Sequence, residues 1–333
     1  MKAFTVQRYG DVAVQASDVP EPRMGEDDVL VQIHAASVNP LDLKTRDGDF
    51  KAILPYRVPF VLGNDLAGVV VGVGAGVTRF TAGDEVYARP DKNRIGTFAE
   101  RIAVADADLA LKPGSISMAE AGSLPLVALT AWQALVERGN VQPGQKVLIH
   151  AGAGGVGSIA IQLAKHLGAT VAATASGSNV DFVRELGADT VIDYRTHDFE
   201  QILSGYDLVL DSLGGENLEK SLRVLRPGGQ AIGIAGPPDP AFARDAGLNP
   251  VLRLAIAGLS GKIRRQAKKL GVRYEFLFVR ASSDQLRQIT TLVDQGVLRP
   301  VVGKVFGFGQ TPQALQSLSK GGIRGKAVIT VNN

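Results

Sequence analysis

The stretch KVLIHAGAGGVGSIAIQLAKHLG, residues 146–168, decides the fold. It begins with the short apolar run Lys146–Ala151, which predicts a strand, and it ends with the helical spacing of Val156–Leu167. The glycine-rich loop Gly152–Gly157 lies between the two. A G-x-G-x-x-G loop is a weak signal when it stands alone, but between a strand and a helix it is typical of a dinucleotide-binding site.

Each of the three motif glycines has a physical role. Gly152 permits the tight turn, Gly154 removes a Cβ where a pyrophosphate must approach, and Gly157 lets the helix pack closely on the strand. The free N–H groups at the start of the helix then bind the phosphates. A glycine-rich turn without a ligand is the alternative, and the place of this loop between strand and helix favours the dinucleotide site.

The strand–helix unit repeats after this loop. Further strands are expected at 170–175, 189–194, 207–211 and 230–235, with helical stretches between them. Parallel strands joined by helices of this length form a doubly wound α/β sheet. The first ~120 residues are instead rich in strand-like runs and turn signals. At roughly 100–200 residues per domain, a chain of 333 residues is expected to form two domains.

The composition excludes several classes of protein. The sequence has no cysteine, which excludes disulfides, thiolate-bound zinc, iron–sulfur clusters and a cysteine nucleophile. Its 36 Lys and Arg and 33 Asp and Glu give a net charge of +3, too mild to indicate a nucleic-acid partner. The start MKAFTVQRYG lacks a signal-peptide pattern, and no apolar run of about 18 residues occurs. We therefore expect a soluble, cytoplasmic protein without a membrane partner.

The end of the second strand indicates which dinucleotide binds. Enzymes that use NAD place an acidic residue about 20 residues after the loop, on the ribose 2′-hydroxyl. Here the segment Ala175–Asn179 carries hydroxyls and an amide, and no acid precedes Asp181. A carboxylate would repel a 2′-phosphate, so its absence favours NADPH. Arg195, after the third strand, could supply the positive charge or could be a solvated surface arginine.

Four further motifs connect the chain to a known family. They are PFVLGNDLAG (59–68), GDEVY (83–87), AGAGGVG (151–157) and RGKAV (324–328). Together they resemble the medium-chain dehydrogenase/reductase superfamily over essentially the whole chain. The resemblance implies a Rossmann domain that binds the dinucleotide, a β-rich GroES-like catalytic domain built from both chain ends, and a homodimer.

The same resemblance implies where the domains begin and end. The first segment of the catalytic domain is expected at 1–122, and the Rossmann NADP-binding domain is expected at 123–260. The C-terminal segment, 261–333, is expected to return to the catalytic domain.

Zinc alcohol dehydrogenases of this superfamily bind catalytic zinc at positions that look equivalent to Asn39, Asn64 and Leu126. Two amides and an alkyl group cannot replace thiolate and imidazole as zinc ligands. The cysteine-rich lobe that holds structural zinc is missing as well. The resemblance is therefore to the zinc-independent quinone oxidoreductase branch, and no metal site is predicted.

Within that branch, the chain is similar to the NADPH-dependent alkenal and enone reductases. NPLDLK (39–44) and RDGDFK (46–51) match their N-P-x-D-x-K and R-x-G-x-F-K motifs. The resemblance implies a small-molecule substrate, an α,β-unsaturated carbonyl compound, whose carbon–carbon double bond takes hydride from NADPH. No general acid is identified, and solvent can supply the proton.

The resemblance also places the cofactor. Lys44 would lie at the nicotinamide end, where it holds the ribose or stabilises an oxyanion, and a surface lysine is the third alternative. Phe276–Val279 would line the nicotinamide pocket, Tyr194 would flank the adenosine phosphate, and the Gly325–Lys326 pair would reach the phosphates. The complete expected set is Lys44, Thr130, Gly152, Gly154, Gly155, Val156, Gly157, Ser176, Gly177, Ser178, Asn179, Tyr194, Phe276, Leu277, Phe278, Val279, Gly325 and Lys326.

Two alternatives to an enone reductase stay open. The same cleft between the domains could present a quinone to the hydride. The segment Leu254–Leu270 predicts an amphipathic basic helix, which is either a solvated face on the core or a surface for RNA or another partner. In the latter case the chain would be a cofactor-bound binding protein with incidental turnover.

Overall fold

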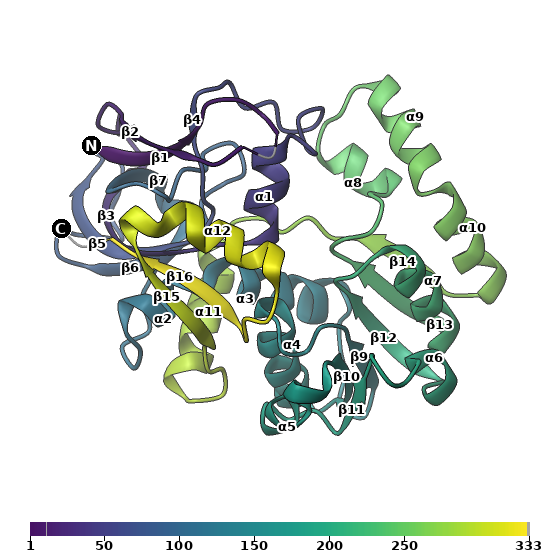
Figure 1. Ribbon diagram of the computed structural model, residues 1–333. Coiled ribbons are helices and arrows are strands. Elements are labelled where there is room, and N and C mark those ends of the chain that lie inside the picture. The colour runs from purple at the N-terminus through teal and green to yellow at the C-terminus, as the bar shows by residue number, and fades with distance from the viewer. Residues whose placement is uncertain (11, 332–333) are drawn as a thin grey trace. The chain divides into compact units, whose positions relative to one another are not determined.

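The computed structural model describes residues 1–10 and 12–331. It forms two compact units, coloured by residue number in Figure 1. Unit 1 combines Met1–Leu129 with the chain from Arg280 onward, and unit 2 comprises Thr130–Val279. Both ends of the chain therefore contribute to unit 1, as the family resemblance implies.

Unit 2 is built on a parallel sheet with the strand order β11-β10-β9-β12-β13-β14. The strands are β9 (Lys146–Ile149), β10 (Thr170–Ala175), β11 (Thr190–Asp193), β12 (Tyr206–Asp211), β13 (Leu225–Gly233) and β14 (Arg273–Phe276). The order runs outward in opposite directions from the neighbours β9 and β12, which confirms the doubly wound sheet. Val147, Leu148 and Ile149 are fully buried, because helices cover both faces.

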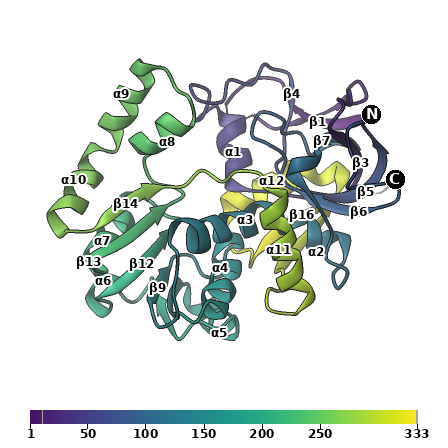
Figure 2. The same cartoon turned by 180° about the vertical axis from the view of Figure 1, so that it is seen from behind.

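The helices of unit 2 are α4 (Gly155–His166), α5 (Val180–Glu185), α6 (Phe199–Ile202), α7 (Gly215–Val224), α8 (Pro240–Asp245), α9 (Pro250–Leu259) and α10 (Gly261–Leu270), with a π-helical segment at Gln133–Arg138 and a 3-10 turn at Gly177–Asn179. Most of them cover the two faces of the sheet, whereas α8 and α9 extend beyond its β14 edge (Figure 2). Right-handed crossovers place α4 and α5 on one face and α7 and α10 on the other. Leu148 of β9 accordingly packs in one core cluster with Leu222 of α7 and Ile263 of α10.

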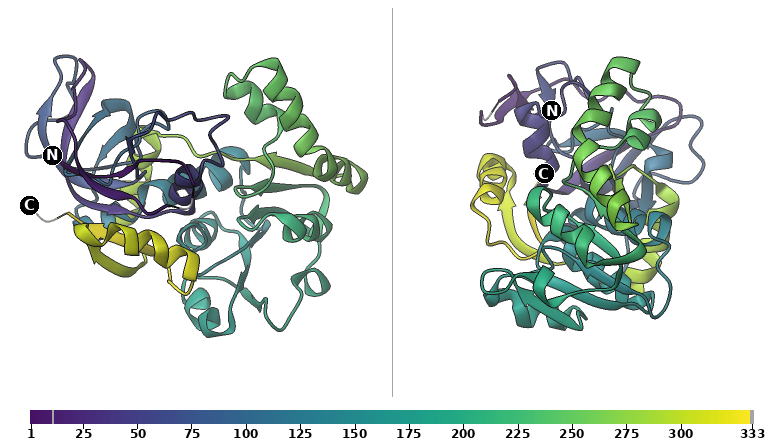
Figure 3. Two further views of the ribbon diagram at one scale, coloured as in Figure 1. Left: turned by 45° about the horizontal axis from the view of Figure 1, so that its top comes forward. Right: turned by 90° about the vertical axis from the view of Figure 1, so that its right-hand side faces the viewer.

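The segment Leu254–Leu270 forms parts of two helices rather than one. The buried Ser260 separates α9 from α10, and its Oγ donates a hydrogen bond to the carbonyl oxygen of Ile256 at 3.1 Å. A serine that bonds back to the preceding turn bends a helix. Figure 3 shows α8, α9 and α10 following one another along one edge of unit 2. The expected basic amphipathic helix is therefore α10 alone.

The contact boundaries of the units differ from the expected domain boundaries. Gln230 of β13 pairs with Arg273 of β14, so the chain stays with the parallel sheet beyond residue 260 and leaves it after Val279. The first boundary follows Leu129, inside α3 (Pro125–Trp132), rather than residue 122. Pairing of β14 with β13 sets the second boundary, and local sequence signals do not report pairing between distant segments.

Unit 1 contains two sheets. The smaller has the order β2-β1-β4, and the larger has the order β15-β16-β3-β5-β6-β8, with β7 also paired to β3. The strands are β1 (Lys2–Val6), β2 (Gln15–Asp18), β3 (Asp28–Ser37), β4 (Phe60–Val61), β5 (Leu66–Val73), β6 (Glu85–Ala88), β7 (Arg101–Ala105), β8 (Leu109–Leu111), β15 (Val302–Gly307) and β16 (Lys326–Thr330). The helices are α1 (Pro40–Asp47), α2 (Met118–Gly122), α3, α11 (Ser283–Asp294) and α12 (Thr311–Lys320), with 3-10 turns at Asp106–Asp108 and Phe308–Gln310.

The C-terminal segment enters the larger sheet through β16. Val328 and Ile329 pair antiparallel with Ser37 and Ala36 of β3. Ile329 is fully buried in the same core cluster as Ile33 of β3, so the core of unit 1 contains side chains from both chain ends. Among the described residues, no helix combines the length and apolar character that a membrane crossing requires.

Two glycines of β5 provide a matched test of strand packing. A Cβ on Gly68 would overlap the carbonyl oxygen of Gln32 in the adjacent β3, whereas a Cβ on Gly72 would meet only the Cβ of Leu30 at 3.8 Å. Gly68→Ala should therefore force the two strands apart and lower the free energy of unfolding by roughly 1–3 kcal/mol. Gly72→Ala should change it by less than about 1 kcal/mol. Urea denaturation followed by circular dichroism measures both, and equal midpoints for the two variants would contradict the packing.

Candidate functional site

The glycine-rich loop joins the end of β9 to α4 in the way the sequence predicts. Ala151 adopts a left-handed conformation with φ +52°, and the N–H of Gly152 donates to the carbonyl oxygen of Thr174 at 2.8 Å. A Cβ on Gly157 would overlap the carbonyl oxygen of Ala151. Only glycine at position 157 allows α4 to begin this close to the loop.

The start of α4 suits the binding of a pyrophosphate. Gly154 is the N-cap residue, so the N–H groups of Gly155, Val156 and Gly157 have no carbonyl of a preceding turn to bond. The first turn carries no acidic side chain, and Lys165 with His166 stands in the last turn. Partial positive charge at the N-terminus of this helix therefore attracts an anion, and the residues present fit the phosphates of a dinucleotide.

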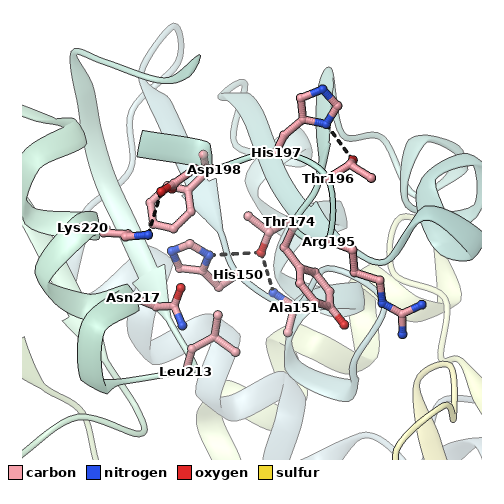
Figure 4. Close-up of a pocket in the computed structure, with 12 residues that line it drawn as sticks. His150, Ala151, Thr174, Arg195, Thr196, His197, Asp198, Leu213, Asn217 and Lys220 are labelled. Carbon is pink, nitrogen blue, oxygen red and sulfur yellow. Dashed lines mark hydrogen bonds and ion pairs between the residues drawn. The ribbon is translucent and has the colours of Figure 1, made fainter. Parts of the chain in front are cut away.

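A pocket of about 640 Å³ lies beside this loop, where the carboxyl ends of β9, β10, β11 and β12 meet (Figure 4). Doubly wound sheets bind ligands at this switch point between strands that run outward in opposite directions. The pocket is lined by His150, Ala151, Thr174, Tyr194, Arg195, Thr196, His197, Asp198, Phe199, Leu213, Asn217 and Lys220. Of the expected cofactor set, the pocket contains Tyr194. Apart from Arg195, the remaining lining residues were not predicted from the sequence, because they come together from the ends of separate strands and share no local motif.

The two cations that line the pocket differ in their partners. The Lys220 ammonium lies 2.7 Å from a carboxylate oxygen of Asp198, and this hydrogen bond raises the pKa of Lys220 and lowers that of Asp198. The Arg195 guanidinium lies 5.9 Å from the ring centre of Tyr194, and it has no ion pair with any described residue. Arg195 is therefore the cation in this pocket whose charge is not already compensated.

The loop after β10 lies against an acid that the sequence analysis missed. Asn179 Nδ2 donates to Ser176 Oγ at 2.9 Å, and a Cβ on Gly177 would come within 2.6 Å of a carboxylate oxygen of Asp193. Asp193 ends β11, the parallel neighbour of β10, and pairs with Ala175. The alternation of strands and helices in the sequence could have predicted this contact, since neighbouring parallel strands end at the same edge of the sheet. The exposed Ser178 completes the loop.

His150, the residue after β9, is buried. Its Nδ1 lies 3.1 Å from Thr174 Oγ1 and its Nε2 lies 2.9 Å from Ser221 Oγ. Burial lowers the pKa of the imidazole. Because both ring nitrogens have partners within the sheet and α7, His150 is held in place rather than free to exchange a proton with a ligand.

The expected nicotinamide-pocket residues follow β14. Phe276, Leu277 and Val279 are buried, and Phe278 is half-buried. The ring of Phe242 in α8 lies 5.2 Å from that of Phe276 and 5.8 Å from that of Phe278. These residues form an apolar cluster, and their contact with nicotinamide stays a prediction. The same holds for Thr130, which is buried in α3.

A buried polar network occupies the interior of unit 1 at the positions that correspond to zinc ligands. The Lys326 ammonium donates to the carbonyl oxygen of Val38 at 2.9 Å and to Asn39 Oδ1, and it lies 3.4 Å from a carboxylate oxygen of Asp65. Lys326 is 6% exposed. The structure therefore does not support the predicted contact of Lys326 with the cofactor phosphates, because its ammonium is buried and bonded to groups of unit 1.

The other members of this network bind carboxylates. Asn64 Nδ2 donates to Asp42 Oδ1 at 2.7 Å, and the N–H of Asn39 donates to Asp42 Oδ2 at 2.7 Å. Burial raises the pKa of Asp42 to about 7 against the effect of these hydrogen bonds. The N–H of Leu126 donates to Asp65 Oδ1 at 2.6 Å, so this position contributes its backbone to the network.

Lys44 and Gly325 lie in unit 1 as well. Lys44 is on α1, half-buried, and its ammonium has no hydrogen bond or ion pair with any described residue. Gly325 has φ +64°, and a Cβ there would overlap the carbonyl oxygen of Val301, so it is required for strand entry whatever else it does. Of the two expected cofactor-binding lysines in unit 1, Lys326 is bonded to protein groups, and Lys44 has an ammonium that could bind a ligand.

Comparison with known proteins assigns the chain to a family. A model described as alcohol dehydrogenase GroES-like domain matches residues 25–114, and one described as zinc-binding dehydrogenase matches residues 186–329. The NAD(P)H oxidoreductase RTN4IP1, mitochondrial, of Danio rerio is 34% identical, with 99% of this chain and 91% of that protein covered. The chain belongs to the medium-chain dehydrogenase/reductase superfamily.

Two further members of the superfamily are similar over their whole domain organisation. The NADPH-dependent alkenal/one oxidoreductase, chloroplastic, of Arabidopsis thaliana is 36% identical, with 99% of this chain and 79% of that protein covered. The crystal structure of the quinone oxidoreductase from Coxiella burnetii has a TM-score of 0.85 at 31% identity, with 100% of this chain and 99% of that chain covered. These relatives confirm the Rossmann and GroES-like architecture and the quinone oxidoreductase branch.

This member of the superfamily has the wrong donors for zinc at the expected positions. Asn39 and Asn64 supply amides, Leu126 supplies an alkyl group, and the Lys326 ammonium lies among them with its positive charge. Zinc requires thiolate, imidazole or carboxylate ligands and would be repelled by an ammonium group. Among residues 1–10 and 12–331, no group of three His, Cys, Asp or Glu side chains is placed to hold a metal ion. The alkenal/one oxidoreductase and quinone oxidoreductase relatives agree with this donor set, and the chain belongs to the zinc-independent branch.

The ammonium–carboxylate contact predicts a large loss of stability when one partner is removed. Lys326→Met keeps the length of the side chain and leaves the Asp65 carboxylate buried without its cation, so the free energy of unfolding should fall by about 3–5 kcal/mol. The double variant Asp65→Asn/Lys326→Met removes both charges and should recover part of that loss. Urea denaturation measures both, and a single variant as stable as the original chain would contradict the network.

Proposed function

We propose that this oxidoreductase transfers hydride from NADPH to the carbon–carbon double bond of α,β-unsaturated carbonyl compounds. The chain is an oxidoreductase, and its cofactor is NADPH. Reduction of the double bond, rather than of a simple ketone, is supported by the side chains around Asn39, Asn64 and Lys326, which are unsuited to binding zinc. Without a Lewis acid, a simple ketone loses the main electrostatic help for reduction at its carbonyl carbon.

A conjugated acceptor needs less help from the protein. NADPH, when bound, supplies a hydride from C4 of its nicotinamide ring. The hydride forms a bond with the β-carbon, the π electrons move to the carbonyl oxygen, and a proton then reaches the α-carbon. The developing oxygen anion requires a hydrogen-bond donor or a cation and no metal. The name of the Arabidopsis relative, an alkenal/one oxidoreductase, supports this substrate class.

Residues of unit 2 would hold the two phosphate-bearing parts of the cofactor. The N–H groups of Gly155 and Val156 at the start of α4 would bind the pyrophosphate. The Arg195 guanidinium would bind the 2′-phosphate, with the hydroxyls of Ser176 and Ser178 as further donors. Because Asn179 stands where relatives of the enone group often have lysine, Arg195 carries the charge at this end in our proposal.

In unit 1, Lys44 would act at the nicotinamide end. A charged ammonium without a protein partner can donate to the nicotinamide ribose or to the oxygen anion of the substrate. The two roles differ in consequence, since the first binds the cofactor and the second lowers the barrier of the chemical step.

A quinone reductase is the second candidate. The Coxiella relative is named a quinone oxidoreductase, which supports this candidate, and a quinone is itself a conjugated dicarbonyl compound that accepts hydride. The expected homodimer and the cytoplasmic location stay predictions, and two relatives are named as mitochondrial and chloroplastic.

A substrate panel tests the proposed function. Purified protein with NADPH should oxidise the cofactor rapidly in single turnover with enones and alkenals, more slowly with quinones, and negligibly with saturated ketones. Saturated carbonyl products identified by mass spectrometry would establish reduction of the double bond. Faster turnover of quinones would favour the second candidate, and activity only with saturated ketones would overturn both.

The cofactor preference is predicted from the loop after β10 and from Arg195. Ser176→Asp should place a carboxylate against the 2′-phosphate and shift the preference toward NADH. Arg195→Ala should lower kcat/KM for NADPH by roughly tenfold or more, with little change for NADH, because a charge-assisted hydrogen bond is lost. Equal kcat/KM values of the unaltered protein for NADPH and NADH would show that this interpretation of the loop is wrong.

Lys44→Ala should lower kcat/KM by roughly 10- to 150-fold, which corresponds to ~1.5–3 kcal/mol for one charge-assisted hydrogen bond. Loss of a ribose contact should mainly raise KM for NADPH, whereas loss of anion stabilisation should lower kcat with cofactor binding intact. The exposed Lys304→Ala on β15 is the matched control. If both constants of Lys44→Ala stay within about twofold of the original values, Lys44 is an ordinary surface residue.

A further inference from the structure

One segment of unit 2 concentrates positive charge far beyond the average of the chain. Between Asp245 and Glu275 the sequence contains seven Lys and Arg residues and no acid. The whole chain has a net charge of only +3, so the residues outside this segment together carry a net charge of −4. The segment comprises α9 and α10, and we call it the basic edge.

The cations of the basic edge are directed away from the core. Ile263 and Ala267 of α10 are buried in the core cluster of the parallel sheet. The exposed cations of this helix are Lys262, Arg264, Arg265, Lys268 and Lys269. Lys262 pairs with Glu219 of α7, and the other four have no ion pair with any described residue. This charge is therefore available to an external anion.

The preceding helix exposes large aliphatic side chains. Val251 is 77% exposed, Leu254 is 76% exposed and Leu259 is 67% exposed. Val251 and Leu254, three residues apart, lie on the same side of α9 and away from the buried Ile256, and Leu259 is exposed at the end of the helix. α10 follows α9 directly in the chain, with only Ser260 between them, and Figure 3 (right) shows the two helices in succession. Ordinary solvation explains the cations but not three large aliphatic side chains exposed on one short helix.

We propose that the basic edge is a peripheral docking surface for an anionic phospholipid bilayer. Aliphatic side chains of α9 would enter the headgroup region, while the cations of α10 would attract lipid phosphates. A helix of this length is far too short to cross a bilayer and would lie in its plane. The expectation of no membrane partner depended on the lack of a crossing segment, which a peripheral surface does not need.

The observations favour lipid over nucleic acid. RNA would bind the cations but would gain nothing from Val251, Leu254 and Leu259. Single-stranded nucleic acids also use aromatic side chains for stacking, and no aromatic residue occurs between Phe242 and Tyr274. The surface shares no residue with the cofactor pocket or with the Lys326 network, so the proposal does not rest on the proposed function.

Flotation of the full chain with phospholipid vesicles tests the proposal. We expect the protein to float with vesicles that contain phosphatidylglycerol, to dissociate at high salt, and to bind weakly to pure phosphatidylcholine. Lys268→Ser/Lys269→Ser should weaken binding roughly 10- to 30-fold, since each cation near an anionic surface contributes. Leu254→Ser should weaken it roughly tenfold or more at low salt. Oxidoreductase turnover without lipid should be unchanged in these variants.

Matched controls separate this surface from general charge and apolar exposure. Lys304→Ser/Val305→Ser changes an exposed cation and an exposed aliphatic residue of β15 in unit 1 and should leave vesicle binding unchanged. The proposal is overturned if anionic vesicles do not bind, or if the control weakens binding as much as the variants of the basic edge. Binding to RNA that exceeds binding to vesicles and is insensitive to Leu254→Ser would also overturn it.

Discussion

The contact between the Lys326 ammonium and the Asp65 carboxylate determines how unit 1 is assembled. Lys326 begins β16 near the C-terminus, Asp65 precedes β5, and Asn39 caps α1, so one buried cation joins three segments far apart in the sequence. Two buried charges are costly unless each is paired and hydrogen-bonded, and here Asp65 also accepts hydrogen bonds from Ser37 and from the backbone of Leu126. A shift of β16 along β3 would separate Lys326 from Asp65 and Asn39, so these contacts favour the observed register of β16.

This network also explains the chemistry left to the enzyme. The family resemblance places zinc ligands of other members at the positions of Asn39 and Asn64, whereas here these amides donate hydrogen bonds to Asp65 and Asp42. Positive charge remains in the same region of the fold, but it is fixed on a lysine that is already bonded to Val38 and Asn39. A conjugated acceptor suits this arrangement, because its negative charge develops on the carbonyl oxygen, away from the carbon that takes the hydride, and needs no metal ion.

The sequence predicted features that depend on local order and missed those that depend on strand ends meeting. The Gly152–Gly157 loop, the parallel strands and the absence of zinc donors follow from neighbouring residues, and the structure has the loop and the strands where they are expected. Asp193 beside Gly177, and the pairing of Lys220 with Asp198, require the spacing of adjacent strands and helices to be known. The RGKAV motif predicts a contact of Lys326 with the phosphates, but a sequence motif does not show that the side chain is buried.

The discontinuity of unit 1 has a consequence for synthesis on the ribosome. Unit 2 is contiguous, from Thr130 to Val279, so all of its strands are synthesised before β15 and β16 of unit 1. Unit 1 forms later, because β3 lacks its partner and Asp65 lacks its cation until β16 (Lys326–Thr330) has been synthesised. The nascent N-terminal segment therefore exposes an unpaired strand edge for most of translation, a state in which chains are vulnerable to association and to chaperone capture.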